Sequence, residues 1–145
     1  MYKHILIATD GTELAQKAVT EGLGLAKILG AKATAVTVTE PWAAVATGEM
    51  ALGFPRDQYD KGAAENAADI LTTVSEVAKA MGMDCATIHA KDQYPAEGII
   101  AAAKEKGCDL IVMASHGRRG IAKLLIGSEA IRVLTLSTVP VLICR

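Results

Sequence analysis

Short apolar runs alternate along the chain with longer segments in which apolar positions recur every three or four residues. Runs of four to eight residues are typical of buried strands, and the longer periodic segments are typical of amphipathic helices. Strands are expected at residues 4–9, 32–39, 83–90, 110–113 and 139–144. Helices are expected at residues 12–29, 60–81, 95–106 and 128–137. The pattern thus predicts five strands and four main helices that alternate.

The predicted helices carry the residues expected at helix ends. Gly30 and Gly82 follow the first two helices, where a left-handed residue commonly ends a helix. Pro95 stands at the first position of the third helix, where proline is tolerated. On the first helix, one apolar stripe is expected to face the core: Leu14, Ala18, Gly22, Leu25 and Leu29.

Residues 41–58 show no clear period, and so long an irregular connection is unusual in a compact domain. Two interpretations stay open, a mobile lid or an insert that holds a short helix. No linker, repeat or low-complexity segment divides the rest. The chain is therefore expected to form one domain over residues 1–145, with a variable insert at about 41–60.

Strict alternation implies right-handed crossovers and an open parallel sheet that is covered by helices on both faces. In such sheets ligands bind beyond the carboxyl ends of the strands, where the strand order reverses. The candidate site residues therefore follow the first, second and fourth strands: Thr9 to Thr12, Thr39 and Glu40, and Ala114 to Gly117.

Composition restricts the function. The 15 Lys and Arg residues nearly balance the 16 Asp and Glu residues, so no general basic field exists to collect nucleic acid or anionic membrane. No stretch reaches the roughly 18–20 apolar residues that span a bilayer, and the start lacks the features of a signal peptide. A cytoplasmic protein whose anion site is local is expected.

Three cysteines, Cys85, Cys108 and Cys144, are far apart and form no C-x-x-C pair. No histidine stands at metal-ligand spacing from them. They are expected to be reduced, small apolar residues, and no metal site made of protein ligands is expected.

The most informative segment is residues 111–128, I-V-M-A-S-H-G-R-R-G-I-A-K-L-L-I-G-S, in which a strand leads into a glycine loop and then into a helix start. Glycine loops and helix N-termini present backbone amides and partial positive charge to phosphate. Arg118, Arg119 and Lys123 either balance phosphate charge or are solvated charges of a loop. Neither a carboxylate nor a nucleophile is recognised beside His116, which is expected to be part of the loop structure.

Asp10 follows the first strand and allows two roles. Its carboxylate could cap the first helix, or it could accept hydrogen bonds from a ribose or a base amine. Both roles are compatible, because a cap at this position faces the same cleft.

Three segments, I-L-I-A-T-D-G-T-E-L-A-Q-K-A-V, P-A-E-G-I-I-A-A-A-K-E-K-G-C-D-L-I-V-M-A-S-H-G-R-R-G and G-S-E-A-I-R-V-L-T-L-S-T-V-P-V-L-I-C, together resemble the universal stress protein family. The resemblance covers nearly the whole chain, except residues 41–60. In the nucleotide-binding branch of that family the signature is G-x-x-G, nine residues, then G followed by Ser or Thr. Gly117, Gly127 and Ser128 match it, whereas Ala114 stands where the first glycine is expected.

The resemblance implies a Rossmann-like sheet of the adenine nucleotide alpha hydrolase-like kind, with strand order 3-2-1-4-5. It places Ala8 and Asp10 by the adenosine and Val38 against the base. It places Met113 and Ala114 by the ribose. Around the phosphates it places Gly117, Gly127, Ser128, Glu129 and Ala130. With Thr9, His116, Arg118 and Arg119 these residues make up the expected site.

The implied function is that of an adenine-nucleotide-binding module in stress response or signalling, with ATP or AMP as ligand and Mg²⁺ held through the phosphates. Bound ATP is expected to order the 117–127 loop and the 41–60 segment and so to alter a surface for an unknown protein partner. The sequence offers no nucleophile–base pair for covalent catalysis, so at most a slow ATPase side activity is expected. ATP, AMP and a cyclic nucleotide stay open.

The alternative is a nucleotide-free dimer of the same family that acts as a protein-interaction module, and Ala114 motivates it. An alanine fits there if φ is negative, but adds roughly 1 kcal/mol or more of strain if φ must be positive. Other classes fit poorly: a receiver domain needs an acidic cluster and a late lysine, and the P-loop motif is absent. After the first strand, A-T-D-G-T lacks the Ser/Thr-rich phosphate loop of flavodoxins. It also lacks the serine-glycine-rich loop of the adenylating enzymes that are related to the stress proteins.

The last strand, residues 139–144 (V-P-V-L-I-C), is very apolar. An open apolar edge invites aggregation, so the strand from Val139 to Cys144 is expected to pair across a two-fold axis in a homodimer, as is common in the family. The alternative is a monomer whose edge is covered by a loop.

Overall fold

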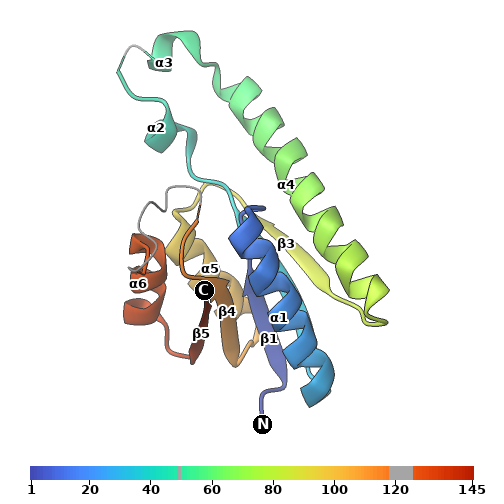
Figure 1. Cartoon of the computed structure of the whole chain (residues 1–145). Helices are drawn as coiled ribbons and strands as arrows, with labels where there is room; N and C mark the ends of the chain where they lie inside the picture. The colour runs from blue at the N-terminus through green and yellow to red at the C-terminus, as the bar shows by residue number, and fades with distance from the viewer. Residues whose placement is uncertain (49, 118–125) are drawn as a thin grey trace.

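A single parallel sheet lies at the centre of the computed structural model, which describes residues 1–48, 50–117 and 126–145. The strands are β1 (His4–Ala8), β2 (Lys32–Val38), β3 (Ala86–Ala90), β4 (Leu110–Ala114) and β5 (Val141–Cys144). Their order is β3-β2-β1-β4-β5, and every neighbouring pair is parallel (Figure 1). The predicted fold class and strand order are therefore confirmed.

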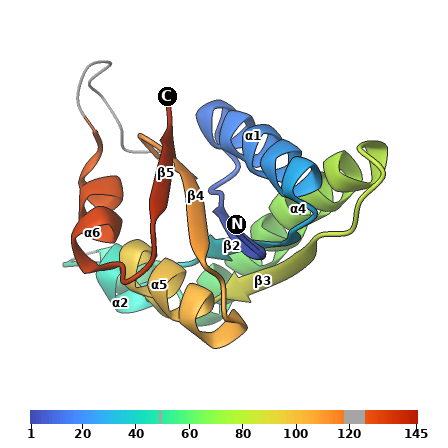
Figure 2. The ribbon, with the colours of Figure 1, turned by 90° about the horizontal axis from the view of Figure 1, so that it is seen from below.

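Four long helices cover the two faces of this sheet (Figure 2). The helices on one face are α1 (Glu13–Leu29) and α4 (Arg56–Ala80), and those on the other face are α5 (Pro95–Lys106) and α6 (Ser128–Leu136). β1 and β4 are covered on both sides, and Ile5, Leu6 and Ile7 are 0% exposed. Burial on both faces explains why these strands read as continuous apolar runs.

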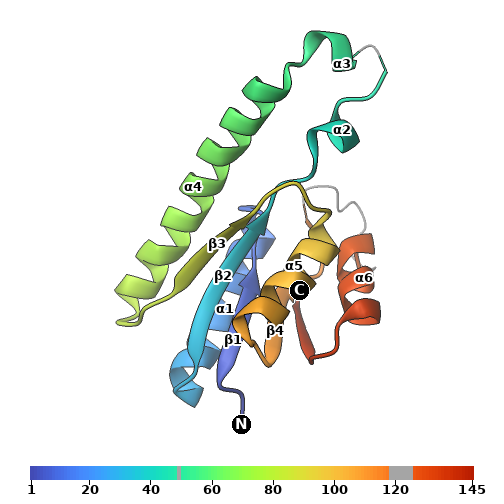
Figure 3. The ribbon, with the colours of Figure 1, turned by 180° about the vertical axis from the view of Figure 1, so that it is seen from behind.

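The connection between β2 and α4 is more ordered than its sequence pattern suggests. It contains two four-residue helices, α2 (Trp42–Val45) and α3 (Met50–Gly53). α4 begins at Arg56, earlier than the predicted start at residue 60, because Pro55 precedes it and accepts a hydrogen bond from the Tyr59 amide at 3.1 Å. The structure thus contains two short helices where one interpretation expected a single one, and the mobile lid stays a prediction. Figure 3 shows that α2, α3 and the first turns of α4 extend beyond the carboxyl ends of the strands.

The stripe predicted for α1 is partly confirmed, because its Ala18 and Gly22 are buried, but its three leucines are not. Leu14 and Leu25 are only partly buried, and Leu29 is 37% exposed. The fully buried residues are mostly small: Ala15, Ala18, Val19, Gly22, Leu23 and Ala26. Small residues allow α1 to approach the sheet closely, so packing distance rather than hydrophobicity selects this face.

Gly22 is where that close approach is tightest. A Cβ atom there would lie 2.8 Å from Ile7 Cγ1 and 2.9 Å from Ile7 Cδ1, both within the core. We expect Gly22→Ala to lower the free energy of unfolding by about 1–3 kcal/mol, because the buried Ile7 must move. Urea unfolding measures this change.

Gly24 of the same helix is the matched control. A Cβ atom there would meet only Met81 Cε, at 3.9 Å. Gly24→Ala should therefore raise stability by up to about 1 kcal/mol through helix propensity. Equal effects of the two substitutions would contradict the assignment of Gly22 as a close-packing position.

Candidate functional site

A cleft of about 670 Å³ opens at the carboxyl ends of β1, β2 and β4. Its volume lies within the range of small-molecule sites. Of the predicted site residues that the structure describes, Gly11 and Thr12 do not line this cleft. The others do: Ala8, Thr9, Asp10, Val38, Thr39, Glu40, Met113, Ala114, Ser115, His116, Gly117, Gly127, Ser128, Glu129 and Ala130. Arg118, Arg119 and Lys123 lie outside the described residues, as does most of the loop that ATP is expected to order.

The turn after β1 is organised by Asp10 and Thr12. Asp10 Oδ1 accepts hydrogen bonds from the Thr12 amide at 3.0 Å and from Thr12 Oγ1 at 2.6 Å. Thr12, not Asp10, is the N-cap of α1, because its hydroxyl oxygen accepts from the Ala15 amide at 3.3 Å. The capping role predicted for Asp10 is therefore wrong: its carboxylate instead holds the capping threonine in place.

Gly117 brings the turn after β1 together with the turn after β4. A Cβ atom on Gly117 would lie 2.7 Å from Asp10 Oδ2. The carboxylate that closes the first turn thus touches the backbone of the second turn. These two loops, more than 100 residues apart in sequence, form one continuous wall of the cleft.

Ala114 ends β4 and lies opposite Cys144 in the pairing with β5. Within the described residues only Asp92 is a non-glycine residue with positive φ, so Ala114 has the ordinary negative φ of a strand. Its methyl group causes no left-handed strain there. The structural reason for treating this position as an obstacle is therefore removed.

The backbone closes tightly where α6 begins. The Gly127 amide donates to the Ser115 carbonyl at 2.7 Å. A Cβ atom on Gly127 would lie 2.9 Å from that same carbonyl oxygen and 3.5 Å from His116 Cα. Gly127 has φ −64, so close approach rather than unusual conformation requires glycine here.

The N-terminus of α6 faces the cleft through Ser128, Glu129 and Ala130. The first amides of a helix have no intrahelical partner, and they carry partial positive charge. The Glu129 carboxylate accepts a hydrogen bond from the Ala96 amide at 3.0 Å, in the first turn of α5. Its negative charge therefore stabilises the N-terminus of α5.

His116 forms a hydrogen-bonding pair that the sequence interpretation overlooked. Its Nδ1 lies 3.0 Å from the hydroxyl of Ser115, a neighbour in sequence. The hydroxyl is therefore paired with an imidazole, although covalent catalysis also needs a third group that orients the base. His116 Nε2 is buried and has no hydrogen-bond partner among the described residues. Such an orphaned polar atom at a cleft is a candidate donor to a ligand.

The remaining wall comes from the connection after β2, which the sequence interpretation left indistinct, and from α4, for which it predicted a helix but no site residue. Its cleft-lining residues are Glu40, Val45, Phe54, Gln58, Tyr59, Gly62, Ala63 and Asn66. Composition holds a signal for this wall: the chain has one Trp, one Phe and three Tyr, and three of these five aromatic residues fall within residues 42–59.

The thiols are not activated. Burial raises the pKa of Cys85 and of Cys108 to about 11 and that of Cys144 to about 12. All three cysteines are free. Because thiolate is the reactive form, these values indicate inert side chains. In the described part of the chain no three His, Cys, Asp or Glu side chains gather as a metal site.

Comparison with known proteins agrees with this geometry. The model of the universal stress protein family matches residues 1–145. The universal stress protein YxiE of Bacillus subtilis (strain 168) is 34% identical over 151 residues, which cover 100% of both chains. The structure of the universal stress protein UspA from Lactobacillus plantarum superposes with a TM-score of 0.82 at 25% identity and covers 99% of this chain and 98% of its own.

A further solved structure shares the fold. It is a universal stress protein crystallised in complex with cAMP, with a TM-score of 0.70 at 24% identity. It covers 99% of this chain and 97% of its own.

Proposed function

Because the chain belongs to the universal stress protein family, we propose that its cleft binds an adenine nucleotide and that the protein acts as a nucleotide-dependent module in stress response or signalling. The observation that carries the proposal is the meeting of three features in one cleft: the Asp10 turn, the Gly117 and Gly127 backbone, and the N-terminus of α6. Each feature suits one part of a nucleotide.

Different residues of the cleft are proposed to contact different parts of the nucleotide. Asp10 and Ala8 lie by the adenosine, Val38 by the base, and Met113 and Ala114 by the ribose. The phosphates lie at Gly117, Gly127 and the first turn of α6, where amides and the helix dipole attract negative charge. Mg²⁺, which prefers phosphate oxygens and water, would enter with the phosphates rather than on protein ligands.

The fold shared with a cAMP complex favours adenine as the base. A protein of the same fold holds cAMP in its crystal structure, so this architecture accommodates an adenine nucleotide. We propose ATP as the ligand because the first amides of α6, which have no intrahelical partner, offer several donors to a phosphate chain. Binding rather than turnover is proposed, since no third group among the described residues bonds to His116 Nε2 and orients the Ser115–His116 pair.

Calorimetric titration with ATP tests the proposal. We expect saturable heat with one site per chain, and AMP should bind more weakly because it lacks the β- and γ-phosphates. No heat at millimolar ATP would remove the proposal. Mass spectrometry of the denatured protein, which identifies any nucleotide that copurifies, distinguishes ATP from AMP and cAMP.

The nucleotide-free interaction module loses the argument that motivated it. That argument rested on strain at Ala114, and Ala114 has negative φ within β4. We propose that the protein partner binds a surface that changes when the nucleotide binds.

No helix in the described ranges is long and apolar enough to cross a membrane.

We further propose that the protein forms a homodimer through β5. β5 is an edge strand of the sheet, and Leu142 on it is 41% exposed. Ile131, Leu134 and Leu136 of the adjacent α6 are also exposed, by 51%, 43% and 49%. An unpaired edge beside large apolar side chains is typical of a surface that another chain covers.

A further inference from the structure

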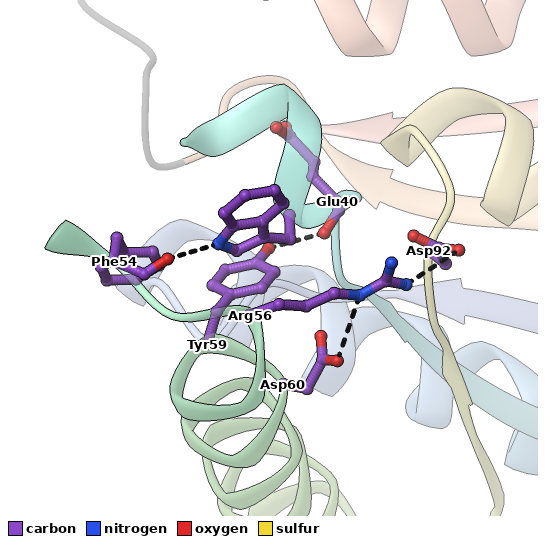
Figure 4. A network of polar contacts seen from close by, with 7 residues as sticks. Glu40, Phe54, Arg56, Tyr59, Asp60 and Asp92 are labelled. Atoms are coloured by element: carbon purple, nitrogen blue, oxygen red, sulfur yellow. Dashed lines mark hydrogen bonds and ion pairs between the residues drawn. The ribbon is translucent and has the colours of Figure 1, made fainter. Parts of the chain in front are cut away.

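Phe54 and Tyr59 line the cleft, and Trp42 is hydrogen-bonded to the Phe54 carbonyl; we call these three residues the aromatic cap. Trp42 Nε1 donates to the Phe54 carbonyl at 2.8 Å, and Tyr59 Oη donates to the Glu40 carbonyl at 2.6 Å (Figure 4). The rings of Phe54 and Tyr59 pack at a tilt of 54°, with centroids 5.8 Å apart. The cap therefore joins the end of β2 to the start of α4 by side-chain contacts.

Tyr59 is the residue that joins the cap to the cleft. Burial raises the pKa of its hydroxyl, and the carboxylates of Glu40, Asp60 and Asp92 raise it further. The hydroxyl stays protonated and keeps donating to Glu40. The ring is thereby held at one place on the rim, by its hydroxyl and by its contact with the Phe54 ring.

Ion pairs between charged side chains near the cap form a second connection between these elements. Arg56 lies 3.6 Å from Asp60 on α4 and 4.0 Å from Asp92, which follows β3 (Figure 4). All three side chains are more than half exposed, so each ion pair contributes little by itself. Their position matters more than their energy, because Arg56 connects the start of α4 with the loop that follows β3.

The held ring lies beside the position proposed for the base. Glu40, whose carbonyl holds Tyr59, follows Val38 by two residues, and Val38, Tyr59 and Phe54 all line the cleft. An aromatic face is the surface on which a nucleobase stacks, whatever hydrogen bonds its edge makes. We propose that the aromatic cap is the base-recognition wall of this cleft and that the ring of Tyr59 stacks on the base of the bound nucleotide.

This inference rests on the proposed function, and it adds residues that neither the signature nor the loops supply. It commits to a ligand with a planar heteroaromatic base. A phosphate chain alone would be held at the α6 end and would not use Tyr59.

The test compares Tyr59→Phe with Tyr59→Leu by calorimetry with ATP. Both variants lack the hydroxyl, so any loosening from its loss is common to both, and only the first keeps a ring. We expect Tyr59→Phe to bind ATP within about twofold of the unchanged protein and Tyr59→Leu to bind roughly tenfold more weakly. Emission of Trp42, the one tryptophan of the chain, reports in parallel whether the cap keeps its structure.

Each outcome decides. A phenylalanine-to-leucine affinity ratio near ten with equal Trp42 emission supports stacking. A ratio below two overturns the inference while ATP binding by the unchanged protein leaves the proposed function standing. A large ratio with shifted Trp42 emission in the leucine variant assigns the effect to cap collapse and also overturns it. If the unchanged protein does not bind ATP, the proposed function fails, and the inference fails with it.

Should Tyr59→Leu not fold, Phe54→Leu takes its place. Phe54 packs against Tyr59 and lines the same cleft. The expected loss of ATP affinity is smaller, about threefold, because Phe54 acts mainly by fixing the Tyr59 ring. An ATP affinity equal to that of the unchanged protein would contradict the proposal that the aromatic cap recognises the base.

Discussion

Replacing Gly127 by alanine is expected to weaken ATP binding by about 10- to 100-fold while the chain still folds. The added Cβ would lie 2.9 Å from the Ser115 carbonyl oxygen. That oxygen belongs to the backbone directly after β4 and already accepts the Gly127 amide at 2.7 Å, so it cannot rotate away as a side chain would. The strain must therefore move the start of α6.

Displacement of α6 matters because its first amides are the proposed phosphate donors. Hydrogen bonds to charged groups contribute about 1.5–3 kcal/mol each, and losing about 1.4 kcal/mol reduces affinity tenfold. Calorimetry with ATP measures the loss, and urea unfolding should show a decrease of about 1–3 kcal/mol in stability. An affinity within threefold of the unchanged protein would contradict the proposed phosphate position.

Gly24→Ala is the control for this experiment, since its Cβ meets nothing closer than Met81 Cε at 3.9 Å and Gly24 does not line the cleft. It should leave ATP affinity unchanged. Gly117→Ala gives a graded comparison. Its Cβ would lie 2.7 Å from Asp10 Oδ2, a side-chain atom that can shift, so a smaller loss than for Gly127→Ala is expected.

Much of the fold could be predicted from the sequence because the central strands are buried on both faces. Residues 5–7 of β1 and every residue of β4 are buried, which produces short apolar runs that are easily recognised. The edge strands were predicted less well: β3 begins at Ala86 rather than Met83, and β5 begins at Val141 rather than Val139. Edge strands lack one neighbour, so their apolar pattern extends past their pairing.

The buried face of α1 could not be found from hydrophobicity alone. The sequence favoured a stripe that ends at Leu29, but Leu29 is 37% exposed and Ala15 is buried. The distance between α1 and β1 decides which face is inside, as the contact of Gly22 with Ile7 shows. That distance depends on the tertiary structure, so the spacing of apolar residues along the helix does not predict it.

The cleft-lining residues after β4 and at the start of α6 were predicted from the sequence, whereas the aromatic ones were not. Local sequence signals exist for glycine turns and a helix start, so the residues from Ala114 to Ala130 could be named. The aromatic cap depends on side-chain to backbone bonds across 12 and 19 residues, from Trp42 to Phe54 and from Tyr59 to Glu40. Four-residue helices are also too short to show a period.

The proposed dimer has a backbone arrangement that makes a sharp test possible. The amide of Ile111 in β4 donates to the carbonyl of Pro140, directly before β5, at 3.0 Å. The amide of Ser115, directly after β4, donates to the carbonyl of Cys144 in β5 at 2.8 Å. In a parallel ladder alternate residues face the same neighbour, so the backbone groups of Val141 and Ile143 face away from β4. These outward groups are what a second copy would pair with.

Replacing Leu142 by lysine is therefore expected to convert a dimer into a 15.1 kDa monomer at micromolar concentration. Leu142 is 41% exposed at this edge, and a charge on an edge strand opposes pairing. Because a two-fold contact repeats each residue, one substitution places two lysines at the interface. Sedimentation velocity measures the mass, and Ile28→Lys, at a position of α1 that is 83% exposed, is the control that should stay dimeric. Monomeric unchanged protein would refute the dimer, whereas a dimeric Leu142→Lys protein would place its interface away from β5.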